Sequence, residues 1–225
     1  MSMLAQYIDH TILKPTTSHI EISKICAEAV EYGFAAVCIP PPFVRLALRE
    51  LAGHDKIKAA TVIGFPFGYS TTAAKLAEVE QAIEDGADEL DVVINLIALK
   101  AGDWALLDAE MQTLTQRAHA AGRIVKVIIE SGILTDDEII RCCQVYSRVG
   151  VDFLKTSTGY AEKGATVEAV RLMRANLPPE IRIKASGGIR TYALAQQLID
   201  AGADRLGCSA SVEIVNGEAA ATGGY

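Results

Sequence analysis

The sequence predicts an α/β fold, a (β/α)8 TIM barrel in which helices surround a parallel eight-stranded sheet. One observation is a repeated unit in which a helix pattern ends at glycine and an apolar strand follows. Its clearest copies are GADELD at 86–91, GVDFLK at 150–155 and GADRLG at 202–207. A second is that eight strands can be counted, about 28 residues apart, close to the roughly 30 of a strand–helix repeat. An open doubly wound sheet is the alternative, but no GxGxxG motif follows an early strand.

Each predicted strand is a short β-prone run that begins soon after a helix pattern ends. In chain order the runs are Tyr7–His10, Ala35–Ile39, Ala59–Ile63, Glu89–Asn95, Ile124–Glu130, Asp152–Thr156, Ile181–Ala185 and Arg205–Cys208. Helix starts are indicated by capping boxes, in which the first side chain caps the amide of the fourth residue. Two such boxes are SHIE at 18–21 and TDDE at 135–138, and Asp103 is a further candidate N-cap.

Length and composition favour one domain over residues 1–225, with a flexible tail at 217–225. Half of the residues are apolar, which is enough for one sizeable core. The net charge of −7 does not favour nucleic acid or an anionic membrane as a partner. No apolar run reaches the ~18 residues of a membrane span, and the first residues lack a signal-peptide pattern. We therefore expect a cytoplasmic protein.

The cysteines and histidines form no pattern typical of a disulfide framework or a metal site. The five cysteines are odd in number and lack CxxC spacing. The four histidines are scattered, without an HxH or HExxH motif. We expect structural roles for both residue types, and neither a metal nor a cofactor.

Several charged side chains in the predicted strands are expected to point into the barrel. Side chains alternate between the two faces of a strand, so the isoleucines before Lys184 face the helices and Lys184 points inward. The same parity places Lys126 and Glu130 inward on one strand. The favoured interpretation is that they form an ion pair and neutralise each other's charge. Asp91 and Lys155 are also predicted to face the lumen.

Lys155 and Lys184 are the candidate reactive pair, because they lie on adjacent predicted strands at similar depth. Two partly desolvated ammonium groups disfavour each other's charge and lower the pKa. Moving a lysine pKa from ~10.4 to ~7 takes about 4–5 kcal/mol, which burial and a like charge can supply. An uncharged lysine attacks carbonyl carbon, so we expect Schiff-base chemistry at Lys155. The alternative is structural ion pairing with Asp9, Asp91 or Glu130.

A phosphate site is indicated where the last two predicted strands end. Gly187 and Gly188 follow the seventh strand, and Ser209 follows the eighth at the start of a short helix pattern. Backbone amides in such loops bind phosphate, and in barrels they do so after strands seven and eight. A plain turn is the alternative for the glycine pair. The tail ends at Tyr225, either as a frayed terminus or as an acid that reaches over the barrel mouth.

Two runs, KTSTG at 155–159 and KASGG at 184–188, stand about thirty residues apart. Further runs are YIDHT at 7–11, IGFPFG at 63–68, ELDVVIN at 89–95 and KVIIE at 126–130. With these motifs, nearly the whole chain resembles the deoxyribose-phosphate aldolase family. The resemblance implies reversible cleavage of 2-deoxy-D-ribose 5-phosphate into acetaldehyde and D-glyceraldehyde 3-phosphate through a lysine Schiff base.

The resemblance also implies the role of individual residues. It makes Lys155 the Schiff-base lysine, Lys184 the lysine that perturbs it, Asp91 the proton-handling carboxylate and Tyr225 a helper in proton transfer at C2. The remaining assignments concern substrate binding: Thr158 near a substrate hydroxyl, and phosphate held by amides around Gly159, Gly187, Gly188 and Ser209. We expect a homo-oligomer, a dimer or tetramer.

Two departures from the family pattern bear on phosphate binding. Tyr160 stands where some members have lysine, and Ala210 stands where many have a second serine. Two rival functions remain at this point. One is a barrel aldolase for another phosphosugar or a keto acid, and the other is a phosphosugar-binding barrel without turnover.

Overall fold

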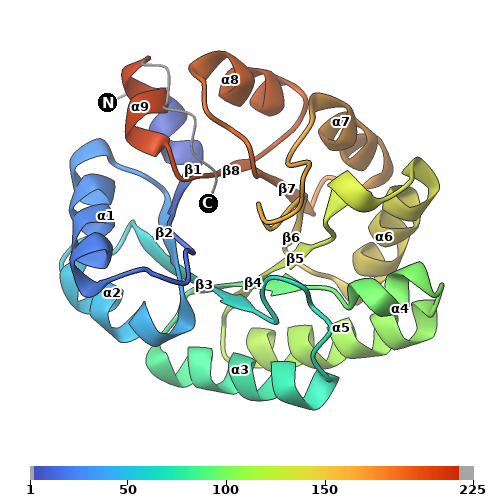
Figure 1. The fold of residues 1–225 in the computed structure, drawn as a ribbon. Coiled ribbons are helices and arrows are strands. Elements are labelled where there is room, and N and C mark those ends of the chain that lie inside the picture. The colour runs from blue at the N-terminus through green and yellow to red at the C-terminus, as the bar shows by residue number, and fades with distance from the viewer. Residues whose placement is uncertain (1–2, 218–225) are drawn as a thin grey trace.

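Eight parallel strands close into a barrel in the order β1 to β8, with β8 paired to β1. The computed structural model describes residues 3–217. Figure 1 shows helices around the outside of the barrel, so the predicted TIM barrel is confirmed. The predicted tail, apart from Gly217, and the candidate Tyr225 lie outside the described residues.

The elements follow the predicted strand–helix alternation. The strands are β1 (Ile8–Thr11), β2 (Ala36–Ile39), β3 (Lys58–Ile63), β4 (Glu89–Val93), β5 (Ile124–Ile128), β6 (Phe153–Lys155), β7 (Arg182–Ser186) and β8 (Arg205–Cys208). The helices are α1 (His19–Tyr32), α2 (Val44–Glu50), α3 (Thr72–Asp85), α4 (Leu96–Lys100), α5 (Trp104–Ala120), α6 (Asp136–Val149), α7 (Val167–Asn176), α8 (Tyr192–Asp200) and α9 (Ser211–Asn216). Short 3-10 helices are η1 (Met3–Tyr7), η2 (Pro41–Phe43) and η3 (Ser131–Ile133).

The fourth and fifth predicted strands run two residues too far at their carboxyl ends, and each has a local cause. The fourth strand stops at Val93 because Asn95 is the N-cap of α4 and its side chain accepts from the amide of Ala98. The fifth stops at Ile128 because Glu130 adopts a left-handed conformation with φ 56° ahead of η3. Both residues therefore belong to the loops at the carboxyl ends of their strands.

Helix ends match their sequence signals. Ser18 and Thr135 each form the predicted capping box, and the side chain of Asp103 accepts from the amide of Leu106. Gly86 and Gly150 close α3 and α6 in the left-handed conformation that glycine adopts without steric cost. These signals set the short connections that bring each helix back to the next strand.

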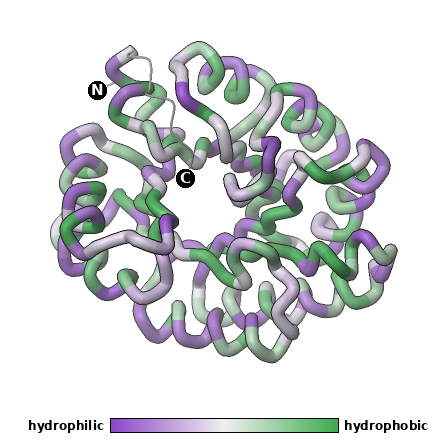
Figure 2. Tube along the Cα trace, viewed as in Figure 1, coloured by the Kyte–Doolittle hydropathy of each residue, from purple (hydrophilic) through white to green (hydrophobic). Residues whose placement is uncertain are grey.

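The main core lies between the strands and the helices. Leu90, Val92, Leu154 and Ile183 are fully buried in it, on the strand face opposite the charged residues. Burying such a side chain contributes about 1.5–3 kcal/mol. Figure 2 shows hydrophobic and hydrophilic residues alternating along the surrounding helices, as expected for helices with one buried face. The lumen is thereby left for polar chemistry.

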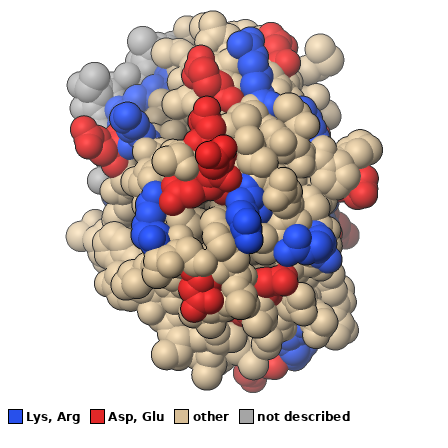
Figure 3. All heavy atoms as spheres, turned by 90° about the vertical axis from the view of Figure 1, so that its right-hand side faces the viewer, with Lys and Arg blue, Asp and Glu red and all other residues tan. Residues whose placement is uncertain are grey.

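The outer surface mixes both signs of charge. Figure 3, which faces the side that carries α4, α6 and α7 in Figure 1, shows Asp and Glu beside Lys and Arg. An ion pair of 2.7 Å between Lys100 Nζ and Glu138 Oε2 links α4 to α6. Within residues 3–217, no helix combines the length and apolar character that a membrane crossing requires.

Candidate active site

Three strands bring Asp91, Lys155 and Lys184 together inside the barrel. Lys155 ends β6 and is the direct register partner of Lys184 on β7. Both ammonium nitrogens lie 2.7 Å from Oδ2 of Asp91 on β4. All three side chains are at most 3% exposed. The carboxylate of Asp91 is therefore shared between two lysines.

A larger ion network extends below this cluster. Lys126 Nζ lies 2.9 Å from Asp91 Oδ1 and 3.2 Å from Asp9 Oδ2, and it also contacts Glu89. Arg205 donates from Nε to Asp9 Oδ1 at 2.6 Å and from Nη2 to Glu89 Oε2 at 3.1 Å. The network thus runs from the amino-terminal ends of the strands to Lys155.

The predicted neutralisation of Lys126 by Glu130 is wrong. Lys126 pairs with the lumen carboxylates, whereas Glu130 accepts hydrogen bonds from the amide and hydroxyl of Thr158. Strand alternation does not extend to Glu130, because the strand has ended and its backbone is left-handed. Burial raises the pKa of Glu130 above its ordinary value, while the bonds from Thr158 oppose that rise.

Lys155 is the extra cation of the lumen. Apart from it, three carboxylates face three cations in the network: Asp9, Glu89 and Asp91 against Lys126, Lys184 and Arg205. Lys155 pairs with Asp91, whose charge Lys126 and Lys184 also share. Within these six groups the charges balance without Lys155, so a charged Lys155 adds a positive charge to them.

The pKa shifts of the two lysines have opposite directions. Burial lowers the pKa of Lys155; Asp91 pulls it back up, and the like charge of Lys184 lowers it further. For Lys184, burial is outweighed by Asp9 and Asp91, which raise its pKa well above the ordinary value. We expected each lysine to lower the pKa of the other. Lys184 differs because it contacts a second carboxylate, Asp9.

Asp91 stays ionised and also meets a thiol. Although burial opposes it, Lys126, Lys155 and Lys184 hold the pKa of Asp91 well below its usual range. The Sγ of Cys38 donates to Asp91 Oδ2 over 3.9 Å, and burial raises the pKa of this thiol. Cys38 is thus a neutral thiol in contact with the cluster of Asp91, Lys155 and Lys184. The sequence placed Cys38 in a buried strand but did not reveal this contact.

A cavity of about 210 Å³ opens beside the lysines at the carboxyl ends of the strands. Its lining includes four of the predicted phosphate-binding residues, namely Gly159, Gly187, Gly188 and Ser209. The fifth substrate-binding candidate, Thr158, lies outside this lining and donates its hydroxyl hydrogen to Glu130. The cavity is near Lys184, since a Cβ added at Gly207 in its wall would lie 3.2 Å from Lys184 Cε.

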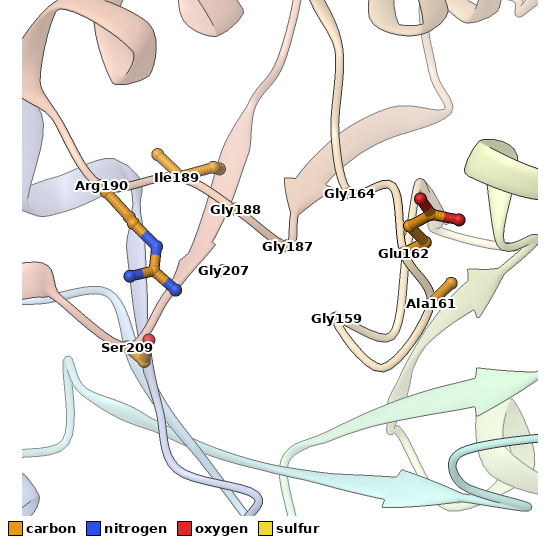
Figure 4. Close-up of a pocket in the computed structure, with 10 residues that line it drawn as sticks. All are labelled: Gly159, Ala161, Glu162, Gly164, Gly187, Gly188, Ile189, Arg190, Gly207 and Ser209. Atoms are coloured by element: carbon orange, nitrogen blue, oxygen red, sulfur yellow. The ribbon is translucent and has the colours of Figure 1, made fainter. Parts of the chain in front are cut away.

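Arg190 adds a cationic side chain that the sequence reasoning missed. Figure 4 shows its guanidinium pointing toward Ser209, across the cavity from Ala161 and Glu162. The available signal was a basic residue two positions after the glycine pair. A guanidinium among glycine amides suits a phosphate group, because both provide hydrogen-bond donors.

Two loops build this cavity by close backbone contact. Gly187 has φ 87°, and a Cβ on Gly164 would lie 2.2 Å from the Gly187 carbonyl oxygen. Glycine at 187 permits the left-handed conformation, and glycine at 164 permits a close approach that a Cβ would block. The hydroxyl of Ser186 donates to the Ser157 carbonyl at 2.6 Å, which ties the end of β7 to the loop after β6.

The chain matches the sequence model of the DeoC/LacD family of aldolases over residues 3–217. It belongs to this family. The deoxyribose-phosphate aldolase of Thermococcus gammatolerans is 50% identical over 215 residues, which cover 95% of this chain and 96% of that protein. The deoxyribose-phosphate aldolase of Streptococcus gordonii is 50% identical over 222 residues, which cover 99% of each chain.

A solved structure of a deoxyribose-phosphate aldolase is also similar to this chain. A deoxyribose-phosphate aldolase from Aeropyrum pernix, described as having a unique tetrameric structure, superposes with a TM-score of 0.87 at 33% identity. The match covers 95% of this chain and 89% of that chain. The lumen cluster described above therefore lies in a barrel of the DeoC/LacD aldolase family.

His10, which lies on β1 of this DeoC/LacD family barrel, points away from the lumen lysines. The ring of His10 faces the helix layer, where it bonds Ser211 Oγ at 2.9 Å and Glu28 Oε2 at 2.8 Å. In the part of the chain that the structure describes, no group of three or more His, Cys, Asp or Glu side chains is placed to hold a metal ion. The five cysteines are unpaired and buried.

Proposed function

We propose that this chain is a class I aldolase that reversibly cleaves 2-deoxy-D-ribose 5-phosphate into acetaldehyde and D-glyceraldehyde 3-phosphate. The observation that carries the proposal is the environment of Lys155, a buried lysine with a lowered pKa whose carboxylate partner is shared with Lys126 and Lys184. Such a lysine has an accessible uncharged form, which is the form that attacks a carbonyl.

The first half of the reaction forms the imine. Lys155 Nζ attacks the aldehyde carbon of the open-chain sugar and gives a carbinolamine. Loss of water, with a proton delivered to the departing hydroxyl, leaves a protonated Schiff base. Lys184 is the proton donor in reach, because its raised pKa keeps it an ammonium beside Asp91.

The second half breaks the C2–C3 bond. The C3 hydroxyl loses its proton, the bonding electrons move into the imine, and glyceraldehyde 3-phosphate leaves an enamine on Lys155. We assign this proton transfer to Asp91, which contacts both lysines, acting through a water and together with Lys184. Protonation of the enamine at C2 and hydrolysis release acetaldehyde. We assign the C2 proton to Tyr225, which lies outside the described residues.

The cavity beside the lysines accounts for the phosphate. We propose that amides around Gly159, Gly187 and Gly188, together with Ser209, receive its oxygens, and that Arg190 supplies the opposite charge. Thr158 is proposed to accept a hydrogen bond from a substrate hydroxyl, since its own hydroxyl hydrogen is donated to Glu130.

The working form of the protein is also proposed. We expect one catalytic domain over residues 1–225, located in the cytoplasm and assembled as a homo-oligomer. The tetrameric description of the Aeropyrum pernix relative supports assembly. Size-exclusion chromatography with light scattering measures the mass directly, and a mass equal to that of one chain of 24.0 kDa would contradict the expectation.

The proposed activity is tested by a donor and substrate panel. We expect turnover of 2-deoxy-D-ribose 5-phosphate with release of acetaldehyde, and in the reverse direction a preference for acetaldehyde over pyruvate and dihydroxyacetone phosphate as donor. A Lys155→Met variant should lose at least ~10⁴-fold in kcat, because no imine can form. A preference for a keto acid or ketone donor would instead identify another aldolase, and binding without turnover would identify a non-catalytic barrel.

A further inference from the structure

A second cavity, of about 1000 Å³, lies at the amino-terminal end of the barrel, away from the candidate active site. Its floor is formed by the first residues of four strands: Glu89, Ile124, Arg182 and Arg205. Its walls include the loop before β2, at residues 33–35, and the segment 53–58, which is the loop before β3 together with the first residue of that strand. Neither the aldol chemistry nor the phosphate cavity uses this space.

The cavity is positively charged although the chain carries −7 overall. Four cations and two carboxylates line it, which leaves two positive charges when His54 is neutral: Lys56, Lys58, Arg182 and Arg205 against Asp55 and Glu89. A local positive surplus on an acidic protein attracts anions to this site and repels cations from it.

Three of these cations have no carboxylate partner among the residues that the structure describes. Arg205 is committed to Asp9 and Glu89. In contrast, no carboxylate oxygen within residues 3–217 lies in ion-pair distance of the cationic groups of Lys56, Lys58 or Arg182. Lys58 Nζ donates to the main-chain carbonyl of Asp55 at 2.8 Å, which leaves its charge uncompensated.

Arg182 is held in place without losing its donors. Its guanidinium carbon lies 4.0 Å from the centroid of the Phe153 ring. Stacking on an aromatic face fixes the plane of a guanidinium and leaves its N–H edge available. Of the three cations without a carboxylate partner among the described residues, Arg182 is therefore ordered at the floor and two lysines lie on the wall.

Backbone donors lie beside these side chains. Ile57 donates to the carbonyl of His54 at 2.9 Å and closes a turn. The amides of Gly53, Asp55 and Lys56 find no acceptor within the described part of the chain. Uncompensated cations and open amides together suit a ligand that presents several acceptor oxygens and negative charge.

We propose that this amino-terminal cavity binds a small multivalent anion of the phosphate or phosphate-ester class. It is a site separate from the phosphate cavity at the carboxyl ends of the strands. Binding there breaks no ion pair of Lys56, Lys58 or Arg182, so the bound anion competes with water and salt alone. Because the cations are exposed, affinity should fall as ionic strength rises.

The test is a residue-resolved NMR titration of the full-length protein with inorganic phosphate, at constant ionic strength maintained with chloride. Amide signals of residues 53–58 report the amino-terminal cavity, and those of Gly187 and Gly188 report the other. We expect saturable shifts in both groups, each with its own Kd. Shifts at residues 53–58 that chloride alone reproduces, or that never saturate, would overturn the proposal.

Variants separate the two cavities. A Lys56→Gln/Arg182→Gln double variant should weaken phosphate binding at residues 53–58 at least tenfold and leave the shifts at Gly187 unchanged. Arg190→Gln removes one charge at the other cavity and should leave binding at residues 53–58 unchanged. The single variant Lys56→Gln keeps the Arg182–Phe153 contact, so a reduced affinity in it excludes a folding defect as the cause. Unaltered binding at residues 53–58 in the double variant would contradict the assignment.

Discussion

Replacing Glu89 by Gln removes one of the three carboxylates that balance the lumen cations, and we expect it to lower the pKa of Lys155. Glu89 lies two residues before Asp91 on β4, a strand rise of roughly 7 Å, and Lys126 contacts both carboxylates. Because Asp91 in turn lies 2.7 Å from Lys155, this chain of contacts places the Glu89 carboxylate at most roughly 10 Å from Lys155 Nζ, and we take that upper limit. At an effective dielectric constant of about 20, the lost attraction is about 1.7 kcal/mol, or roughly one pKa unit.

The sign of the effect follows from the form of lysine that reacts. Lys155 attacks when uncharged, so kcat/KM rises with pH through the pKa of the free enzyme. Glu89→Gln should move this rising part of the pH profile of kcat/KM, its acid limb, to lower pH by about one unit. Arg205→Gln removes a cation from the same layer and should move the limb to higher pH.

The assay is the pH dependence of kcat/KM for 2-deoxy-D-ribose 5-phosphate in the two variants and the parent. Opposite shifts require an electrostatic effect on one titrating group, whereas loss of structure lowers the rate at every pH. Glu89→Gln leaves Lys126 its contacts with Asp9 and Asp91. Limbs that stay in place, or that move in the same direction in both variants, would refute the charge-balance reasoning.

Three further predictions concern the core, the phosphate cavity and the tail. The ammonium of Lys75 is fully buried and lies 2.6 Å from Glu110 Oε1. Glu110→Ala leaves this ammonium without its carboxylate partner and should lower the free energy of unfolding, measured in urea, by about 3–5 kcal/mol. Lys100→Ala, in an exposed pair, should cost about 0–1 kcal/mol, and equal losses would contradict this contrast. Arg190→Gln should raise KM for the phosphorylated substrate about tenfold or more, as expected for a lost charged hydrogen bond, and leave KM for 2-deoxyribose unchanged. A parallel rise for both sugars would remove Arg190 from phosphate binding. Deleting Tyr225 should slow C2 proton exchange far more than it weakens substrate binding, and unchanged exchange would return the tail to a frayed terminus.

Local signals were sufficient for the frame of the barrel. The capping residues Ser18, Thr135 and Asp103 act over three residues, so their outcome depends on little beyond the sequence around them. Strand parity likewise placed Lys155 and Lys184 on the inner face, because the alternation is a property of the strand itself. The repeat length then implied closure into eight strands.

What the sequence did not reveal depends on contacts between distant strands. Asp9 contacts Lys184, and together with Asp91 it outweighs burial and raises the pKa of Lys184, whereas burial lowers the pKa of Lys155. Glu130 failed as a partner for Lys126 because one left-handed residue ends the alternation. Such outcomes need three-dimensional coordinates, since no short-range pattern encodes which carboxylate reaches which lysine.

The central claim is that Lys155 forms the Schiff base, and covalent trapping tests it most directly. Incubation with acetaldehyde and borohydride, followed by peptide mass spectrometry, should place a reduced ethyl adduct on Lys155. Lys184 and Lys126 should stay unmodified, because the carboxylates around them keep both lysines charged. An adduct on another lysine, or activity that survives without any adduct, would contradict the account.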